Sequence, residues 1–311
     1  MLTMQRILAR ELPTALEISP EEIGAEGSPF SREVCMDRLE SANKDLAHDA
    51  ALRESRYLQA EFEFEGPGPT GTQYEYPVEY PANVDTWIKL SAITDQGREI
   101  STVWNQDRRN VWNYYGGAAG TFSSFGYRIQ GNQIIMLQPR YSLYRLFYQR
   151  SPGSLCYGTV QSASGVEVTL SVPTAGRLSN QLNDYVGDTI VFTKDGETDV
   201  IAVVTGFSPA GRVITLREEV SVDDTWEYSF VSWLPRSWQM THVFLAATRF
   251  AAVRQSAAAV CAANYGTMIE TLRHQCRPGD AVTATRVAQS DPGMTFGQSW
   301  TNTGGARNWN I

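Results

Sequence analysis

The chain has 311 residues with a net charge of −8, and 42% of its residues are hydrophobic. This hydrophobic content is enough to bury a core, so it excludes a chain that is disordered throughout. The acidic balance argues against a general nucleic-acid binder, which needs a basic face. Only 19% of residues are charged, and there are eight Trp. Such a composition suits lasting contact with other proteins.

The charge is spread unevenly along the chain and indicates modules. Residues 1–58 carry −4, residues 59–158 carry −1, residues 159–240 carry −6, and residues 241–311 carry +3. The basic residues are 23 Arg and 3 Lys. Arginine is the better interface cation because its planar fork binds two acceptors at once. Genome base composition explains the same bias equally well.

Cysteine usage and hydropathy bear on the compartment. The four cysteines, at positions 35, 156, 261 and 276, form no CxxC pair and are expected to be reduced thiols of a protein made in the cytosol. No apolar run approaches the roughly 20 residues of a membrane span. The first residues lack the apolar stretch of a signal peptide.

The N-terminal part, residues 1–58, is predicted to be helical. A short helix is expected over residues 2–12, ending near Pro13. From Ser31 to about Tyr57, apolar residues recur at three- and four-residue steps on an otherwise charged segment. This apolar stripe needs a partner helix to cover it.

Residues 59–158 are predicted to be rich in β-strands. Residues 61–65 (EFEFE) alternate strictly, as a half-buried strand does. Further strands are expected at 86–93, 126–130, 133–138 and 143–149, with a tight hairpin turn at Gly131-Asn132. The aromatic and Gly-rich stretch 110–126 is expected to be a loop that packs on another surface.

Residues 159–240 are predicted to form an inserted small β-domain. Strands are expected at 166–172, 189–193, 198–205, 212–218 and 226–233. Five short strands at this spacing suggest a small barrel or sandwich.

The last part is predicted to be a long helix followed by an arm. Apolar residues between Phe250 and Leu272 fall on one helical face, with many Ala between them, which predicts a helix over 241–276. Pro278 is expected to end it, and the segment that holds this C-terminal helix is assigned to 241–287. Residues 288–311 are Gly-rich and have no periodicity, yet they keep aromatic residues. This segment is predicted to be an extended arm that becomes ordered on a partner, with the docking residues Phe296, Trp300, Arg307, Trp309 and Ile311.

Together these elements predict an α+β fold. Its core is expected to be a helical bundle, made of the N-terminal helices and the long C-terminal helix. A β-strand region, an inserted small β-barrel or sandwich, and the extended C-terminal arm complete the predicted fold.

Few residues in the sequence suggest a catalytic or metal-binding site. His242 and His274 are candidate metal ligands with Cys261 and Cys276, but zinc sites usually show paired ligands at short spacing. Residues 195–199 have a calcium-loop spacing of acids, without the Gly and Glu that such a loop needs. The acid pairs Asp184/Asp188 and Asp223/Asp224 are open to a glycosidase interpretation. No nucleotide-binding or hydrolase motif is present. The prediction is therefore a protein that is not an enzyme, with no catalytic residue, metal or cofactor.

Three segments in the middle of the chain resemble a known family. They are residues 80–88 (YPANVDTWI), 126–139 (GYRIQGNQIIMLQP) and 143–152 (LYRLFYQRSP). This order is similar to that in the head-to-tail adaptor, or connector, proteins of tailed bacteriophages, especially short-tailed ones. The family often shows a Y-P-A-D-F opening, where this chain has Asn83-Val84-Asp85 after Tyr-Pro-Ala. The 159–235 insert is large for the family.

The resemblance implies a structural virion protein. Such adaptors form a homo-oligomeric ring, usually a dodecamer, beneath the portal protein at the capsid vertex, and they help retain the packaged DNA. The implied partners are the portal, tail or nozzle or tail-fibre proteins below, and further copies of the chain. DNA passes through the ring without specific binding, and no membrane is involved. The implied location is the virion neck, after assembly in the cytoplasm of a bacterial host, and the arm would grip the portal.

In the alternative interpretation, the β region is a module that binds glycans. An exposed Trp on a β face, such as Trp226 or Trp233, would be the platform for a glycan on a virion or cell surface, with or without hydrolysis. The competing interpretation is that these Trp side chains belong to a core or an interface.

Overall fold

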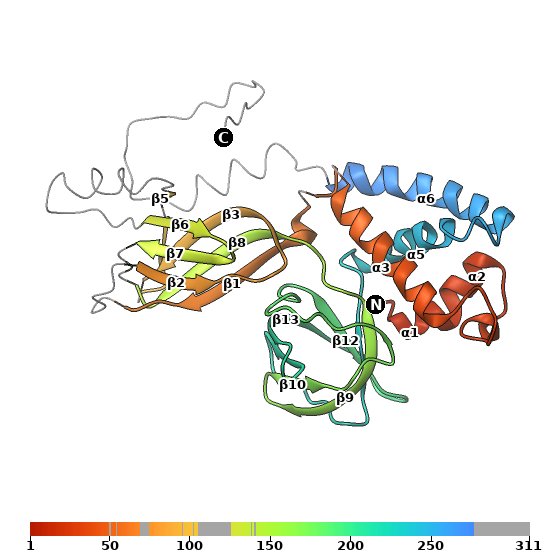
Figure 1. The fold of residues 1–311 in the computed structure, drawn as a ribbon, viewed down its shortest axis with the longest axis horizontal. Helices are drawn as coiled ribbons and strands as arrows, with labels where there is room; N and C mark the ends of the chain where they lie inside the picture. The colour runs from red at the N-terminus through yellow and green to blue at the C-terminus, as the bar shows by residue number, and fades with distance from the viewer. Residues whose placement is uncertain are drawn as a thin grey trace, which may run out of the picture. The chain divides into compact units, whose positions relative to one another are not determined.

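The computed structural model describes residues 1–49, 51–53, 55–68, 75–94, 96–101, 103–104, 126–137, 139 and 141–276. The chain divides into a compact unit, Met1–Arg277, and a second unit, Pro278–Ile311, which lies outside the described residues. Within the compact unit the described chain forms a half-barrel of strands, a closed β-barrel and a group of helices (Figure 1).

The half-barrel consists of two four-stranded sheets. The first sheet has the order β1-β8-β3-β4, with β1 at Gln59–Glu65, β8 at Leu143–Arg150, β3 at Val84–Ile93 and β4 at Glu99–Ser101. The second has the order β2-β7-β6-β5, with β2 at Glu75–Glu79, β7 at Gln133–Leu137, β6 at Gly126–Gln130 and β5 at Val103–Trp104. The two sheets share one hydrophobic cluster, so they fold as one body.

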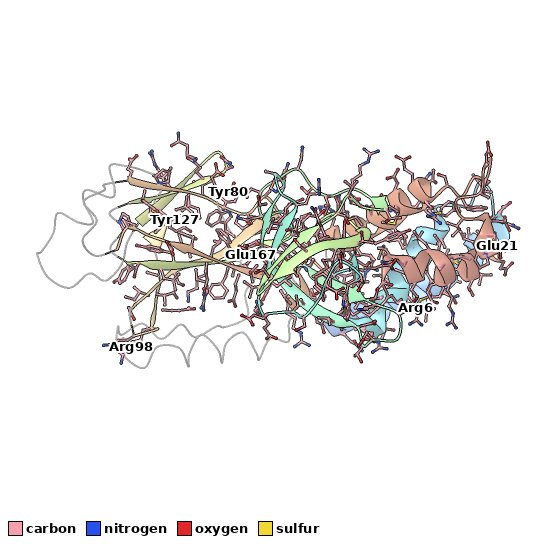
Figure 2. All side chains as sticks on the ribbon, turned by 90° about the horizontal axis from the view of Figure 1, so that it is seen from below. Arg6, Glu21, Tyr80, Arg98, Tyr127 and Glu167 are labelled. Carbon is pink, nitrogen blue, oxygen red and sulfur yellow. The ribbon has the colours of Figure 1, made fainter. Side chains whose placement is uncertain are left out.

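Sequence alternation explains the half-barrel strands. In β1 the glutamates at 61, 63 and 65 point outward while Ala60 and Phe64 are buried, because successive side chains face opposite sides of a strand. Gly131 turns the chain between β6 and β7 with a φ of 59°, a left-handed conformation that glycine adopts readily. Figure 2 shows Tyr80 and Tyr127 among these strands.

The barrel closes on itself. Its six strands follow one another in the order β10-β14-β13-β12-β15-β9, and β9 pairs again with β10. They span Glu167–Leu170, Val213–Leu216, Val200–Ser208, Thr189–Thr193, Glu227–Phe230 and Cys156–Ser164, respectively, and the short β11 at Ala175–Gly176 adds to the outer edge of β9. Apolar side chains from every barrel strand fill the interior together with Tyr185, as small closed barrels require.

The helices lie before and after the strands in the chain. The first helical segment runs from α1 at Met4–Arg6 through a π-helical turn, η1 at Ile7–Glu11, to α2 at Leu12–Leu16. The wide turn carries the chain past Pro13, where a helix end was predicted. A 3₁₀ turn, η2 at Pro20–Glu22, leads to α3 at Arg32–His48, and η3 lies at Arg56–Leu58. After the barrel come η4 at Arg236–Trp238, α5 at Gln239–Thr248 and α6 at Gln255–Cys276. No helix in the described part of the chain is long and apolar enough to cross a membrane.

The predicted fold class is wrong. The protein is mostly β, and its regular elements between Gln59 and Phe230 are all strands within the described residues. The barrel and the half-barrel each enclose a hydrophobic cluster of their own, so a helical bundle is not the core of the molecule. The helical cluster takes in Leu155 and Ala175 from the barrel side, so the predicted helical stripe is covered partly by β structure. Periodicity shows that a helix face is buried, but not what buries it.

The predicted long C-terminal helix is also wrong. The chain leaves the helical conformation after Thr248 and starts α6 at Gln255, and α5 and α6 then pack on each other. The intervening turn buries Phe250 against Phe30, with ring centroids 5.4 Å apart. No Gly or Pro marks this turn in the sequence, so tertiary packing decides it.

Candidate functional site: a buried junction and a polar groove

Two of the four candidate metal ligands, His242 and Cys261, are buried in the helical core, whereas His274 is exposed near the end of α6. His242 is fully buried on α5, and its Nε2 lies 2.7 Å from the carbonyl oxygen of Leu39 on α3. The pKa of His242 is lowered to about 4, mainly by burial; the hydrogen bond to Leu39 opposes this shift and the nearby charge of Arg249 adds to it. The Cys261 thiol donates to the carbonyl oxygen of Ala15. Over the described ranges, no three His, Cys, Asp or Glu side chains come together as a metal site.

The candidate acid pairs also separate into different roles. Asp188 is buried and paired with Arg150, whereas Asp184 lines an open groove. Asp223 is exposed and accepts hydrogen bonds from the hydroxyl and from the backbone N–H of Thr225, which hold the pKa of its carboxyl below the ordinary value. Residues 195–199 lie in the turn between β12 and β13, where Gly196 has a φ of 81°.

The two tryptophans considered for a glycan platform are both buried. Trp226 packs into the barrel cluster with 7% of its surface exposed. Trp233 is 6% exposed, and its indole N–H donates to the carbonyl oxygen of Asn43 on α3 over 3.2 Å. In this structure neither ring offers a free face on which a sugar would stack.

A buried ion pair joins the half-barrel to the barrel. Arg150 ends β8 and Asp188 directly precedes β12, and both side chains lie in the interior. One oxygen of Asp188 is bound by the Arg150 guanidinium, and the other accepts the backbone N–H of Gly153 over 3.0 Å. Burial raises the pKa of the Asp188 carboxyl, and the Arg150 charge and the Gly153 N–H oppose that rise.

The loop before Asp188 completes this junction. Asn83 donates its side-chain amide to the carbonyl oxygen of Val186 over 2.8 Å, and the Tyr148 hydroxyl donates to Asn83. Val186 itself packs into the half-barrel cluster. The residues 182–188, with Asn83, Tyr148 and Arg150, are called the junction below. It ties the barrel to the half-barrel through buried hydrogen bonds.

The sequence contains a signal that Arg150 is buried. Along β8, Tyr144, Leu146 and Tyr148 alternate on the inward face, and Arg150 is the next residue in that series. A period of two therefore places its guanidinium inside, where a carboxylate partner is needed.

A polar groove runs along α3. It has a volume of about 880 Å³ and lies between α3 and residues 174–177. A second hollow of about 560 Å³ shares Lys44, Ser154 and Arg177 with it and continues toward residues 178–184. Much of its charge is already paired, since Lys44 contacts Glu40 over 2.6 Å and Arg177 contacts Glu33 over 2.9 Å. The groove is an open feature without a concentrated charge of one sign.

The predicted docking residues lie outside the described part of the chain. This holds for the arm residues Phe296, Trp300, Arg307, Trp309 and Ile311, and for all but the last residue of the 110–126 segment.

Comparisons with known proteins assign no family to the chain. No family model matches it, and a search of curated proteins finds no match.

Proposed function

We propose that this chain is a structural subunit of a tailed-phage neck, which forms a ring under the portal, connects the capsid to the tail and helps retain DNA. The observation that carries the proposal is that buried polar residues form hydrogen bonds between different parts of the compact unit. Asn43, Arg150, Asp188 and His242 each bridge two different parts of the compact unit. Such cross-links suit a rigid body that transmits load between partners.

The arrangement of the three family-like segments supports the same function. Residues 80–88 lead into and include the start of β3, residues 126–137 of the second segment form the β6–β7 hairpin, and residues 143–152 contain β8. Tyr127 of the hairpin stacks on Trp87 of β3, with centroids 5.9 Å apart and an interplanar angle of 16°. The strands β3 and β8 pair directly. The segments that carry the resemblance therefore build one half-barrel together.

The portal is the proposed partner of residues 288–311. Trp and Arg anchors on a segment that becomes ordered on docking would fill pockets on the partner. The compact unit ends at Arg277, so the arm can be removed without cutting a described element. Deleting 288–311 is expected to leave a folded subunit that no longer binds portal.

Electron microscopy of the full-length protein mixed with a candidate portal is the main test. A ring of this protein on the portal supports the proposal, and portal particles without added density contradict it. The truncated protein serves as the second arm of the test, with circular dichroism to show that it is folded. If the truncated protein bound portal as tightly as the full-length protein does, the proposed role of residues 288–311 would be wrong.

A further inference from the structure

Strand β1 ends its sheet and leaves one backbone edge open. It pairs with β8 along all seven residues, and it is the longest strand at the end of a sheet in the described part of the chain. Alternate backbone groups of a strand point to opposite edges, so half of those of β1 point away from β8. Between Ala60 and Glu65, no other described residue bonds to the backbone along this second edge. Such an edge is a template for an added strand.

Strand β2, at the end of the other sheet of the half-barrel, provides the contrast within the same molecule. It contains Pro77, which is exposed and has no N–H to offer to an added strand. Proline and bulges are the usual devices by which proteins protect a sheet edge. β1 contains no proline, and its register with β8 runs without a bulge from Gln59 to Glu65. Its edge is therefore protected only by the charge of its side chains.

The charge along the open edge has one sign and narrows the choice of partner. Glu61, Glu63 and Glu65 are all exposed on the outward face of β1. Arg145 of β8 contacts the first two, over 3.8 Å and 2.5 Å, but it also binds Glu99 over 3.1 Å, so the glutamates stay in excess. Two β1 edges from two copies would place glutamates opposite glutamates, which is unfavourable. Lys or Arg on an incoming strand would instead form pairs of opposite charge.

The inward face of β1 is incompletely covered at the same edge. Ala60 and Phe64 are buried, whereas Phe62 between them is half-buried, although it packs on the same hydrophobic cluster. Its ring stacks on Phe64, with centroids 5.9 Å apart, and therefore lies on the inward side. A residue opposite Phe62 on an added strand shares its face and removes more of the ring from water. The incoming strand should therefore alternate apolar residues with the basic ones.

We propose that β1 accepts an extended segment of another protein as an added strand, and that this segment alternates Lys or Arg with apolar residues. Backbone hydrogen bonds along Ala60–Glu65 supply the affinity, and the three glutamates select basic side chains. The partner is a different protein, because a second β1 would bring like charges together. The inference does not depend on the ring or on portal binding, since it uses only the edge of one subunit.

The test uses the full-length protein and the fluorescently labelled peptide Lys-Val-Lys-Val-Lys-Val-Lys, which matches the seven residues of β1 in length. Fluorescence anisotropy measures its affinity, and hydrogen–deuterium exchange with mass spectrometry shows which amides it protects. In the control peptide, Pro replaces the central Val, so the charge is kept but strand pairing is broken.

Two protein variants test the selection by charge. Glu61→Gln/Glu65→Gln removes two charges from the β1 edge and keeps Glu63 for Arg145. The matched control, Glu79→Gln/Glu197→Gln, removes the same charge from exposed positions elsewhere. Circular dichroism and thermal melting establish that each variant is folded.

Wild type is expected to bind the Lys-Val peptide with a dissociation constant of about 0.1–1 mM and to gain amide protection in residues 59–65. The proline peptide should bind at least about tenfold more weakly. Glu61→Gln/Glu65→Gln should weaken binding of the Lys-Val peptide about fivefold, and the matched control variant less than about twofold.

Three results would overturn the proposal. The first is no binding of the Lys-Val peptide up to about 2 mM, well above the expected dissociation constant. The second is equal binding of the two peptides, which would mean that charge alone attracts them. The third is equal weakening by the two folded protein variants, or protection that falls outside residues 59–65. Because portal is absent from every measurement, the outcome is separate from that of the proposed function.

Discussion

Arg150 and Asp188 form an ion pair in the interior of the protein, at the point where the half-barrel meets the barrel. Their side chains are only 3% and 7% exposed. A buried charge is costly unless it is paired and hydrogen-bonded. Asp188 meets that condition with the Arg150 guanidinium on one oxygen and the Gly153 N–H on the other.

Removing one partner of this pair should be strongly destabilising. Arg150→Met is expected to lower the free energy of unfolding by about 3–5 kcal/mol, because it leaves an uncompensated buried carboxylate. Asp188→Leu should act similarly through the abandoned guanidinium. Urea denaturation followed by circular dichroism measures both losses.

The double variant Arg150→Met/Asp188→Leu separates pairing from simple packing. It should lose at least about 2 kcal/mol less than the sum of the two single variants, because no charge stays buried. Additive losses would show that the two side chains do not stabilise each other.

Position 187, next to this pair, requires glycine both because a larger side chain has no room and because of its backbone conformation. Its φ is 86°, and a Cβ there would lie 2.7 Å from the Ala60 Cβ and 3.0 Å from the Arg150 Cδ. Gly187→Ala should therefore cost more than about 2 kcal/mol, since left-handed strain and overpacking add.

Gly196 is the matched control for Gly187. It has a similar φ of 81°, but a Cβ there would meet no atom within 4 Å. Gly196→Ala should cost about 1 kcal/mol from strain alone. Equal losses in thermal and urea melts of the two variants would contradict the close packing at the junction.

Local sequence patterns predicted strands better than they predicted the arrangement of the fold. The alternation in 61–65 predicted β1, and the Gly131-Asn132 turn predicted the β6–β7 hairpin. The turn at 249–254 could not be predicted, because its residues are compatible with a helix and only the packing of Phe250 on Phe30 ends it. The prediction of a helical core is wrong for the same reason, because an apolar stripe on a helix does not show which element packs against it.

The junction was equally hard to predict. Asp184 and Asp188 lie four residues apart and are identical in type, yet one lines a groove and the other is buried. Arg150 lies 38 residues from its partner in the chain. Only the closure of the barrel brings this arginine and this aspartate together.

Trp233 should act as a structural anchor between α3 and the segment after β15. Trp233→Phe removes the N–H that reaches the buried carbonyl oxygen of Asn43, and it should cost about 1–3 kcal/mol. Urea denaturation gives the loss. The control is Trp238→Phe, at a half-buried position in the same helical region. A Trp233→Phe loss no greater than that of the control would contradict the anchoring hydrogen bond.

His242 should make the protein less stable in mild acid. Its pKa in the folded state is about 4, below the ordinary value of 6.5, because it is buried without a counter-charge. Between these two values the unfolded chain takes up a proton that the folded chain refuses. The free energy of unfolding therefore falls as the pH drops from about 6.5 to about 4, by up to ~3 kcal/mol from this residue. Below the lower value, this group causes no further loss.

The comparison with His242→Gln isolates this contribution. Glutamine can donate to the carbonyl oxygen of Leu39 but does not titrate. Urea denaturation at pH 7 and pH 4.5 should show a loss that is about 2–3 kcal/mol larger for wild type than for the variant. The carboxylates titrate in both proteins, so their effect cancels in the difference. Equal pH dependence of the two proteins would show that His242 is not held neutral in the core.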